Sequence, residues 1–439
     1  MSFSPLLNKL FGNFFWLFSE KMLRMLITFV VSIYVIRFLG PEQYGMLGYS
    51  MSFSLIFMAI ANLGLDSIVI RDFTRMPESR DKLIGTVFAM RLFAGCLVAM
   101  ISFLLINYIQ HDDELIKWLV LVISFGTVFQ ACDVIDLWFQ SQVKSKYAAW
   151  IRSGALAFSA VLKGSLVYLE APLIAFAAAY AVELGVVAFA FCLLWRKLGL
   201  FSWHLSFSLA GALLKQGLPL LLSGFAVLAI MHIDKIMLGE MGNLRDVGLY
   251  SVASMLSNVF TFLPVIIGST IAPLLVEKQS QGSDAMKDVL EKTFGLMMLL
   301  AIVIILCGAF IAPAAIEFLY GNAFNQSAII FVIQLLTLPF IFHISIRSRA
   351  LVIDGAIGYV CLFSYLCLTS NIFLNYILIP EYGGKGAAIA SLVSWLLSCS
   401  IFPVFFKKTS VYVRMFYFGL PKLIMQLSEN LLMKGRSMV

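Results

Sequence analysis

The sequence predicts an all-α integral membrane protein of about twelve transmembrane helices, in two pseudo-symmetric six-helix bundles around a central cavity. Hydrophobic residues make up 61% of the 439 residues and charged residues only 13%. Soluble domains are about 45–50% apolar and about 25% charged. The apolar residues also gather in long runs, and the second half of the chain repeats features of the first. This composition excludes a large soluble domain and a disordered chain.

A transmembrane helix needs about 20 consecutive apolar residues to cross the bilayer core. Measured against that length, the sequence predicts spans at 11–38, 44–65, 83–106, 115–140, 147–169, 172–195, 211–239, 247–276, 289–318, 326–350, 357–379 and 386–406. The first run is long and only Lys9 precedes it, which favours a signal anchor over a cleaved signal peptide.

The distribution of basic residues predicts that both termini are cytoplasmic. With the N-terminus inside, 22 lysines and arginines fall in cytoplasmic segments, against three on the other side, Lys117, Arg245 and Lys385. This bias follows the positive-inside rule, so the net charge of +7 reflects topology and predicts no nucleic-acid partner. Residues 409–427 contain Arg414, Pro421 and Lys422, which favours an amphipathic helix at the membrane interface over a thirteenth span.

A short repeat indicates the domain organisation. Leu39-Gly40 followed by Tyr49-Ser50 is matched about 200 residues later by Leu238-Gly239 followed by Tyr250-Ser251. We therefore expect an N-terminal bundle at 1–200, a C-terminal bundle at 201–408, and a cytoplasmic or interfacial tail at 409–439. Parallel repeats of this kind are typical of transporters.

Charged residues inside predicted spans are candidate site residues, because a charge in the membrane needs a partner or a wet cavity. Lys21, Arg24 and Arg91 lie well inside their spans, and they could face a hydrated cavity that attracts an anion. Arginine suits a phosphate because its planar guanidinium binds two oxygens at once. The alternative is structural pairing, such as Glu20 with Arg24 one helical turn apart. Cavity or pairing roles are also open for Arg37, Asp133, Lys163 and Glu183.

A cation site is a second hypothesis, for the C-terminal half. Asp234, Asn371 and Asn375 lie at similar predicted depths, and their hard oxygen ligands suit a small cation such as Na⁺ or H⁺. The alternative is that the asparagines only form hydrogen bonds between helices.

Motifs for catalysis are absent from the sequence. It contains no G-x-x-x-x-G-K-[ST] for nucleotide phosphates and no H-E-x-x-H for zinc. The four histidines lack metal-ligand spacing, and the seven cysteines form no CxxC pair. We therefore expect a transporter, not an enzyme, with no cofactor and no bound metal other than the coupling cation. A glycan polymerase or ligase would need a large external loop, and a structural scaffold would not need intramembrane charges in both halves.

Several blocks give the chain a family resemblance that spans nearly its whole length. They are Gly12-Asn13, Glu20-Lys21 and Arg24, then 37–45 (RFLGPEQYG), 62–66 (NLGLD) with Arg71, 319–321 (LYG) and 375–390 (NYILIPEYGGKGAAIA). The sequence resembles the polysaccharide (O-antigen repeat unit) flippase family of the multidrug/oligosaccharidyl-lipid/polysaccharide exporter superfamily.

The resemblance implies a flippase that moves undecaprenyl-diphosphate-linked oligosaccharide from the cytoplasmic to the periplasmic leaflet of a bacterial inner membrane. It implies alternating access coupled to an ion gradient or membrane potential. Further implied partners are a glycan polymerase and a chain-length regulator. By similarity to the lipid II flippase, Lys21, Arg24 and Arg91 would serve the diphosphate, and Asp234, Asn371 and Asn375 the coupling cation. The alternative on the same fold is a cation-coupled exporter of small molecules or drugs.

Overall fold

The computed structural model describes residues 5–110, 113–198, 203–281 and 283–436. Within them, the side chains of 5–21, 77, 280–281, 283–284, 423 and 426–436 are outside the description. The predicted site residues Glu20 and Lys21 therefore lie outside the described side chains. Every regular element in the described ranges is a helix, so the all-α fold class is confirmed.

The chain forms two compact units, Met1–Ile236 and Met237–Val439. The helices that begin in the first unit are α1 (Pro5–Asn62), α2 (Asp66–Arg75), η1 (Pro77–Ser79), α3 (Arg80–Ile109), α4 (Glu114–Val128), η2 (Phe129–Cys132), α5 (Asp133–Ser141), α6 (Lys146–Tyr168), α7 (Leu173–Lys197) and α8 (Phe207–Met241). The division falls inside α8, so most of this helix packs with the first unit.

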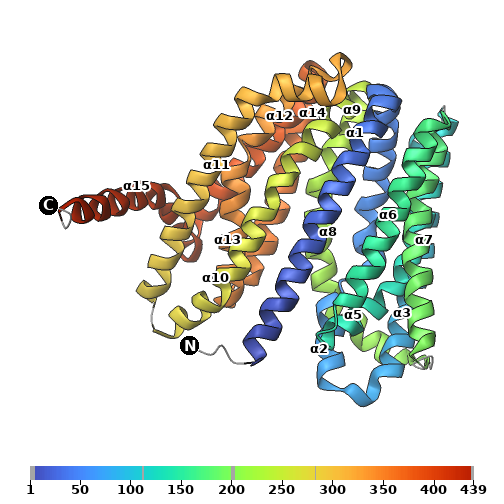
Figure 1. Cartoon of the computed structure of the whole chain (residues 1–439), viewed down its shortest axis with the longest axis horizontal. Helices are drawn as coiled ribbons and strands as arrows, with labels where there is room; N and C mark the ends of the chain where they lie inside the picture. The colour runs from blue at the N-terminus through green and yellow to red at the C-terminus, as the bar shows by residue number, and fades with distance from the viewer. Residues whose placement is uncertain (1–4, 111–112, 199–202, 282, 437–439) are drawn as a thin grey trace. The chain divides into compact units, whose positions relative to one another are not determined.

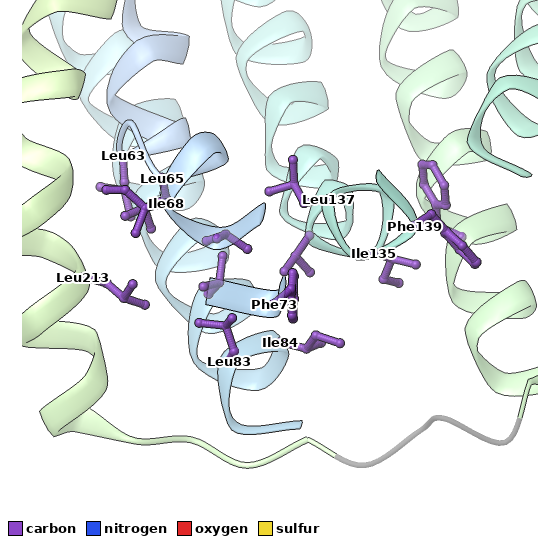
Figure 2. Packing of buried hydrophobic residues seen from close by; sticks show 14 of the residues in the cluster. Leu63, Leu65, Ile68, Phe73, Leu83, Ile84, Ile135, Leu137, Phe139 and Leu213 are labelled. Atoms are coloured by element: carbon purple, nitrogen blue, oxygen red, sulfur yellow. The ribbon is translucent and has the colours of Figure 1, made fainter. Parts of the chain in front are cut away.

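One hydrophobic cluster of the first unit surrounds the short helix α2. α2 packs on α5, and its apolar face buries Ile68, Val69 and Phe73. Figure 2 shows Phe73 between the start of α3, at Leu83 and Ile84, and α5. Since Arg71, Thr74 and Arg75 stay exposed on the other face, α2 lies as an amphipathic helix against the core.

The second unit, like the first, is built of packed helices in its described ranges. Its helices are α9 (Leu244–Asn258), η3 (Val259–Thr261), α10 (Phe262–Gln281), α11 (Ser283–Tyr320), η4 (Asn322–Phe324), α12 (Ser327–Leu335), α13 (Leu338–Ile353), α14 (Ile357–Leu396), η5 (Leu397–Ile401), η6 (Phe402–Phe405) and α15 (Lys407–Arg436). α11 packs on α10, α12, α13 and α15 (Figure 1). α9 and α12 are joined through a buried amide, because Gln334 Nε2 donates to Ser254 Oγ at 2.8 Å.

The element order of the second half repeats that of the first. The helix 41–62, its break and α2 correspond to α9, η3 and α10. The broken pair α4 and α5 corresponds to α12 and α13, and α3 corresponds to α11. The hairpin α6–α7 corresponds to α14, which turns at Gly383 with a positive φ of 54°. This order fits the two-lobe membrane fold that the sequence predicts.

Several predicted spans contain breaks. The span predicted at 115–140 is interrupted by the 3₁₀ turn η2, and that at 326–350 breaks between α12 and α13. Pro264 and Pro339 follow two such breaks and lie near the starts of α10 and α13. A proline is tolerated there because the first N–H groups of a helix have no partner within the helix. The predicted stop at Leu39-Gly40 is confirmed by the non-helical Gly40. The corresponding stop predicted at Leu238-Gly239 comes too early, because α8 continues to Met241.

In the described ranges, nine helical runs are long and apolar enough to cross a membrane, two of which, Met22–Arg75 and Ile357–Phe405, have 54 and 49 residues. About 20 residues cross the bilayer once, so each of these two is long enough for two crossings. α6 and α15 are not among the nine. The count of twelve spans and the cytoplasmic termini stay predictions.

Candidate functional site

In the first unit, a buried arginine forms an ion pair with an exposed carboxylate. Arg91 of α3 is 3% exposed, and its Nη2 forms an ion pair with Asp66 Oδ1. The Asp66 side chain is 63% exposed. Arg91 Nε has no hydrogen-bond partner among the described residues. The predicted site residue Arg91 is therefore buried and paired, with one donor group still unused.

The local sequence explains where Asp66 lies. α1 ends at Asn62, and Leu63 and Gly64 both have positive φ, 56° and 63°, so the chain turns sharply before α2. Asp66 is then the first residue of α2, where a carboxylate is favoured by the helix dipole. This turn brings Asp66 to Arg91, which lies 25 positions further along the chain.

The same turn lies directly against α8. A Cβ on Gly64 would come within 2.5 Å of Leu221 N, and one on Gly217 within 2.6 Å of Leu63 O. Nearby, Arg71 Nη2 donates to Gln216 Oε1 at 2.8 Å. Backbone contact at two glycines therefore fixes the Asp66 turn on α8, the helix that leads into the second unit.

A second charged group joins α5 and α6. Arg152 donates to Asp133 Oδ1 at 3.0 Å and to Asp136 Oδ2 at 2.8 Å. The positive-inside count places Arg152 in a basic cytoplasmic segment; the residue lies near the start of α6 and pairs with two carboxylates, and its membrane side stays a prediction. Asp136 is buried.

A third charged group joins α6 and α7. Lys163 Nζ lies 3.2 Å from Glu183 Oε2, and Ser159 Oγ donates to the same carboxylate oxygen at 2.5 Å. Each charge therefore has its partner on a neighbouring helix. This geometry supports the pairing alternative for Lys163 and Glu183 that the sequence left open.

Two further basic residues among the predicted site residues lie on α1. Arg24 is partly buried and Arg37 is exposed. The pairing proposed for Glu20 with Arg24, and the role proposed for Lys21, stay predictions because those two side chains are outside the description.

The predicted cation ligands fall in different units. Asp234 is buried on the part of α8 that belongs to the first unit. In the second unit, Asn375 Nδ2 donates to Asn371 Oδ1 at 3.1 Å, and Asn371 Nδ2 donates to Ser391 Oγ at 3.3 Å. The two carboxamides thus form a buried ladder along α14, and their role toward a cation stays a prediction. In the described residues, no group of three or more His, Cys, Asp or Glu side chains could hold a metal.

The structure adds a buried arginine in the second unit that sequence reasoning missed. Arg347 of α13 is 2% exposed, and its Nη1 donates to the carbonyls of Ser398 at 3.0 Å and Cys399 at 3.3 Å. These carbonyls belong to η5, a π-helical turn, and the guanidinium lies 5.0 Å from the Phe363 ring centroid. The positive-inside count treats Arg347 as a residue of a cytoplasmic segment and does not predict this burial. Its place within the apolar run 338–353 was the signal of burial.

Arg347→Ala is expected to destabilise the protein by about 2–5 kcal/mol, because it leaves a cavity and two buried carbonyls without their donor. The control is Arg349→Ala, since Arg349 Nη2 donates to Val265 O at 3.2 Å from an exposed position. Thermal unfolding of the purified protein in detergent measures both variants. Equal melting temperatures for the two would contradict the structural role of Arg347.

Known proteins resemble this chain over most of its length. A family described as "Polysaccharide biosynthesis protein" matches residues 10–279. The capsular polysaccharide biosynthesis protein CapF of Staphylococcus aureus is 19% identical over 404 residues, covering 90% of this chain and 99% of the relative.

Solved structures share the fold. The lipid II flippase MurJ in an inward closed conformation has a TM-score of 0.73 at 14% identity, covering 94% of this chain and 92% of that one. An inward-facing MATE-family multidrug resistance transporter of the MOP superfamily has a TM-score of 0.67 at 14% identity, covering 92% and 95%. At such identities the likeness shows the fold alone. It is the two-lobe helical fold of membrane transporters, and it confirms a multi-pass membrane protein.

Proposed function

Because this chain belongs to the polysaccharide biosynthesis protein family, we propose that it flips undecaprenyl-diphosphate-linked oligosaccharide repeat units, of the O-antigen type, across a bacterial inner membrane. The direction is from the cytoplasmic to the periplasmic leaflet. The names of CapF, a capsular polysaccharide biosynthesis protein, and of the MurJ lipid II flippase support this assignment. The family and the fold support a membrane flippase or transporter, and the lipid-linked substrate is our proposal.

The Arg91–Asp66 pair is the observation that best supports an anionic substrate. Arg91 is buried, so leaving its charge unpaired would cost about 3–5 kcal/mol. Asp66 is exposed and can be replaced by another anion with little loss of its own solvation. A diphosphate offers several oxygens to a guanidinium, including its unused Nε, and binds more strongly than one carboxylate. Arg91 would therefore exchange Asp66 for the diphosphate.

The chemistry of the substrate explains why such a site is sufficient. The glycan is too polar to enter hydrocarbon, whereas the polyprenyl chain can stay in lipid throughout. The protein needs only a hydrated, positively lined path that opens to each side in turn. Asp66 would pair with Arg91 again when the diphosphate leaves, so the buried charge is paired both with and without bound substrate.

Coupling to an ion or to the membrane potential completes the proposal. Asp234 is a buried carboxylate, and the Asn371–Asn375 ladder supplies amide oxygens, so these residues are our candidates for Na⁺ or H⁺. The membrane potential alone is a strong source of free energy for transport, since one charge that crosses 100 mV gains about 2.3 kcal/mol.

A deletion strain of the source bacterium tests the proposed substrate. We expect lipid-linked repeat units to accumulate on the cytoplasmic leaflet and the surface glycan to disappear. The wild-type gene should restore the glycan, as should Arg75→Ala, which removes an exposed arginine at the other end of α2 from Asp66. If the repeat units still reach the periplasm and sensitivity to drugs rises instead, the chain is an exporter and the proposal is wrong.

A further inference from the structure

The C-terminal helix α15 is fixed on the second unit by one of its faces. Tyr412, Met415 and Phe416 are buried, and the Phe416 and His343 ring centroids are 4.6 Å apart. A Cβ on Gly419 would come within 2.7 Å of Glu291 O, so α15 and α11 are in close contact there. The contacts recur every three or four residues, which gives α15 one defined inner face.

Polar contacts also hold this inner face of α15 on the second unit, at Asp354 and Glu291. Tyr412 Oη donates to Asp354 Oδ2 at 2.8 Å, beside Gln279 Nε2, which donates to the same side chain at 3.0 Å. Lys422 forms an ion pair with Glu291, and this carboxylate raises the pKa of the Lys422 ammonium. In Figure 1, α15 crosses α11, and its C-terminal end points away from α11. The outer face therefore has a fixed direction.

That outer face carries an apolar stripe. Val411, Phe418 and Met425 are 38%, 67% and 62% exposed, and they are spaced seven residues apart. At 3.6 residues per turn this spacing places them nearly above one another on the helix. Arg414 flanks the stripe on one side. Lys408 and Lys422 flank it on the other, next to the docked face, where Lys408 Nζ donates to Asp354 O at 3.3 Å and Lys422 pairs with Glu291. Such a pattern is typical of helices that lie in the membrane interface.

The charge of the segment is strongly one-sided. Residues 407–436 contain six basic residues, Lys407, Lys408, Arg414, Lys422, Lys434 and Arg436, and one acidic residue, Glu429. α15 is also not among the described helices that are apolar enough to span a membrane. An apolar stripe with cationic borders fits acyl chains below anionic headgroups better than it fits water or a neutral protein surface.

We propose that the outer face of α15 binds the membrane surface through anionic phospholipid, with Val411, Phe418 and Met425 in the interface and Lys407, Lys408 and Arg414 at the headgroups. The docked inner face then ties the end of the second unit, at Asp354 and Glu291, to the plane of that leaflet. This proposal does not depend on the transported substrate.

Hydrogen–deuterium exchange of the full-length protein tests the proposal in nanodiscs that hold one copy each. One set contains only phosphatidylcholine, and the other contains phosphatidylcholine with phosphatidylglycerol. Amides of 411–436 are expected to exchange at least about fivefold more slowly in the anionic nanodiscs. The triple variant Lys407→Gln/Lys408→Gln/Arg414→Gln should lose this difference.

The matched control is Lys144→Gln/Lys146→Gln/Lys197→Gln, which removes three exposed cations from the first unit and should keep the difference. Phe418→Ser should reduce protection without a change in melting temperature, because this residue is 67% exposed. Equal exchange in both nanodiscs would show that anionic lipid does not cover this face. An unchanged difference in the α15 triple variant would also overturn the proposal.

Discussion

Arg91→Ala is expected to reduce transport of the lipid-linked repeat unit by at least about tenfold while the protein stays folded, since it removes charged hydrogen bonds worth about 1.5–3 kcal/mol. The partner Asp66 is exposed and tolerates the loss of Arg91. Arg91→Lys should retain part of the activity, because an ammonium keeps the charge but not the planar pair of donors. Restoration of surface glycan in the deletion strain measures all variants.

Asp66→Asn separates a binding role from a structural one. It leaves the buried Arg91 without its carboxylate, so the melting temperature should fall. If the diphosphate takes the place of Asp66, added undecaprenyl diphosphate should raise the melting temperature of Asp66→Asn more than that of the wild type. The double variant Asp66→Asn/Arg91→Ala should show no such rise. An equal rise in all three proteins would mean that Arg91 is only structural.

Gly64→Ala is expected to destabilise the protein by roughly 2–5 kcal/mol. A left-handed alanine costs about 1–2 kcal/mol, and a Cβ 2.5 Å from Leu221 N must displace backbone, a type of overpacking that costs about 1–3 kcal/mol. Gly217→Ala, on the other side of the contact, should destabilise the protein through overpacking alone. Thermal unfolding in detergent measures the change.

Gly154→Ala is the matched control for this contact. Gly154 lies inside α6, and a Cβ added there would meet nothing within 4 Å, so alanine should be neutral or stabilise by up to about 1 kcal/mol. A Gly64→Ala protein as stable as Gly154→Ala would mean that the α1–α2 turn does not lie against α8 as described.

The helices could be predicted from sequence because each apolar run is long and each polar loop is short. The breaks inside runs were harder. Pro264 and Pro339 stand just after two of them, whereas η2 at Phe129–Cys132 contains neither glycine nor proline. Its 3₁₀ turn comes with tertiary packing, since η2 lies against α3 and α7, and local sequence does not report such contacts.

The charged residues could be listed from sequence, but their partners could not. Reasoning along one helix finds carboxylates four residues away, and it found none for Arg91. Asp66 reaches Arg91 only because Leu63 and Gly64 reverse the chain. Arg152 and Arg347 were counted with the basic residues of cytoplasmic segments, because a basic residue near a span end looks the same whether it points outward or into the protein. Their contacts, and the burial of Arg347, follow from the helices that pack on them.

The most direct measurement uses the purified protein in vesicles that contain the undecaprenyl-diphosphate-linked repeat unit. A glycan-cleaving enzyme added outside reports the fraction of the lipid exposed on the outer leaflet. With wild-type protein, we expect the enzyme to gain access over time to the pool that starts on the inner leaflet. The Arg91→Ala protein should leave that pool protected. A protected pool with wild-type protein, in vesicles where the same protein moves a cationic drug, would contradict the flippase account.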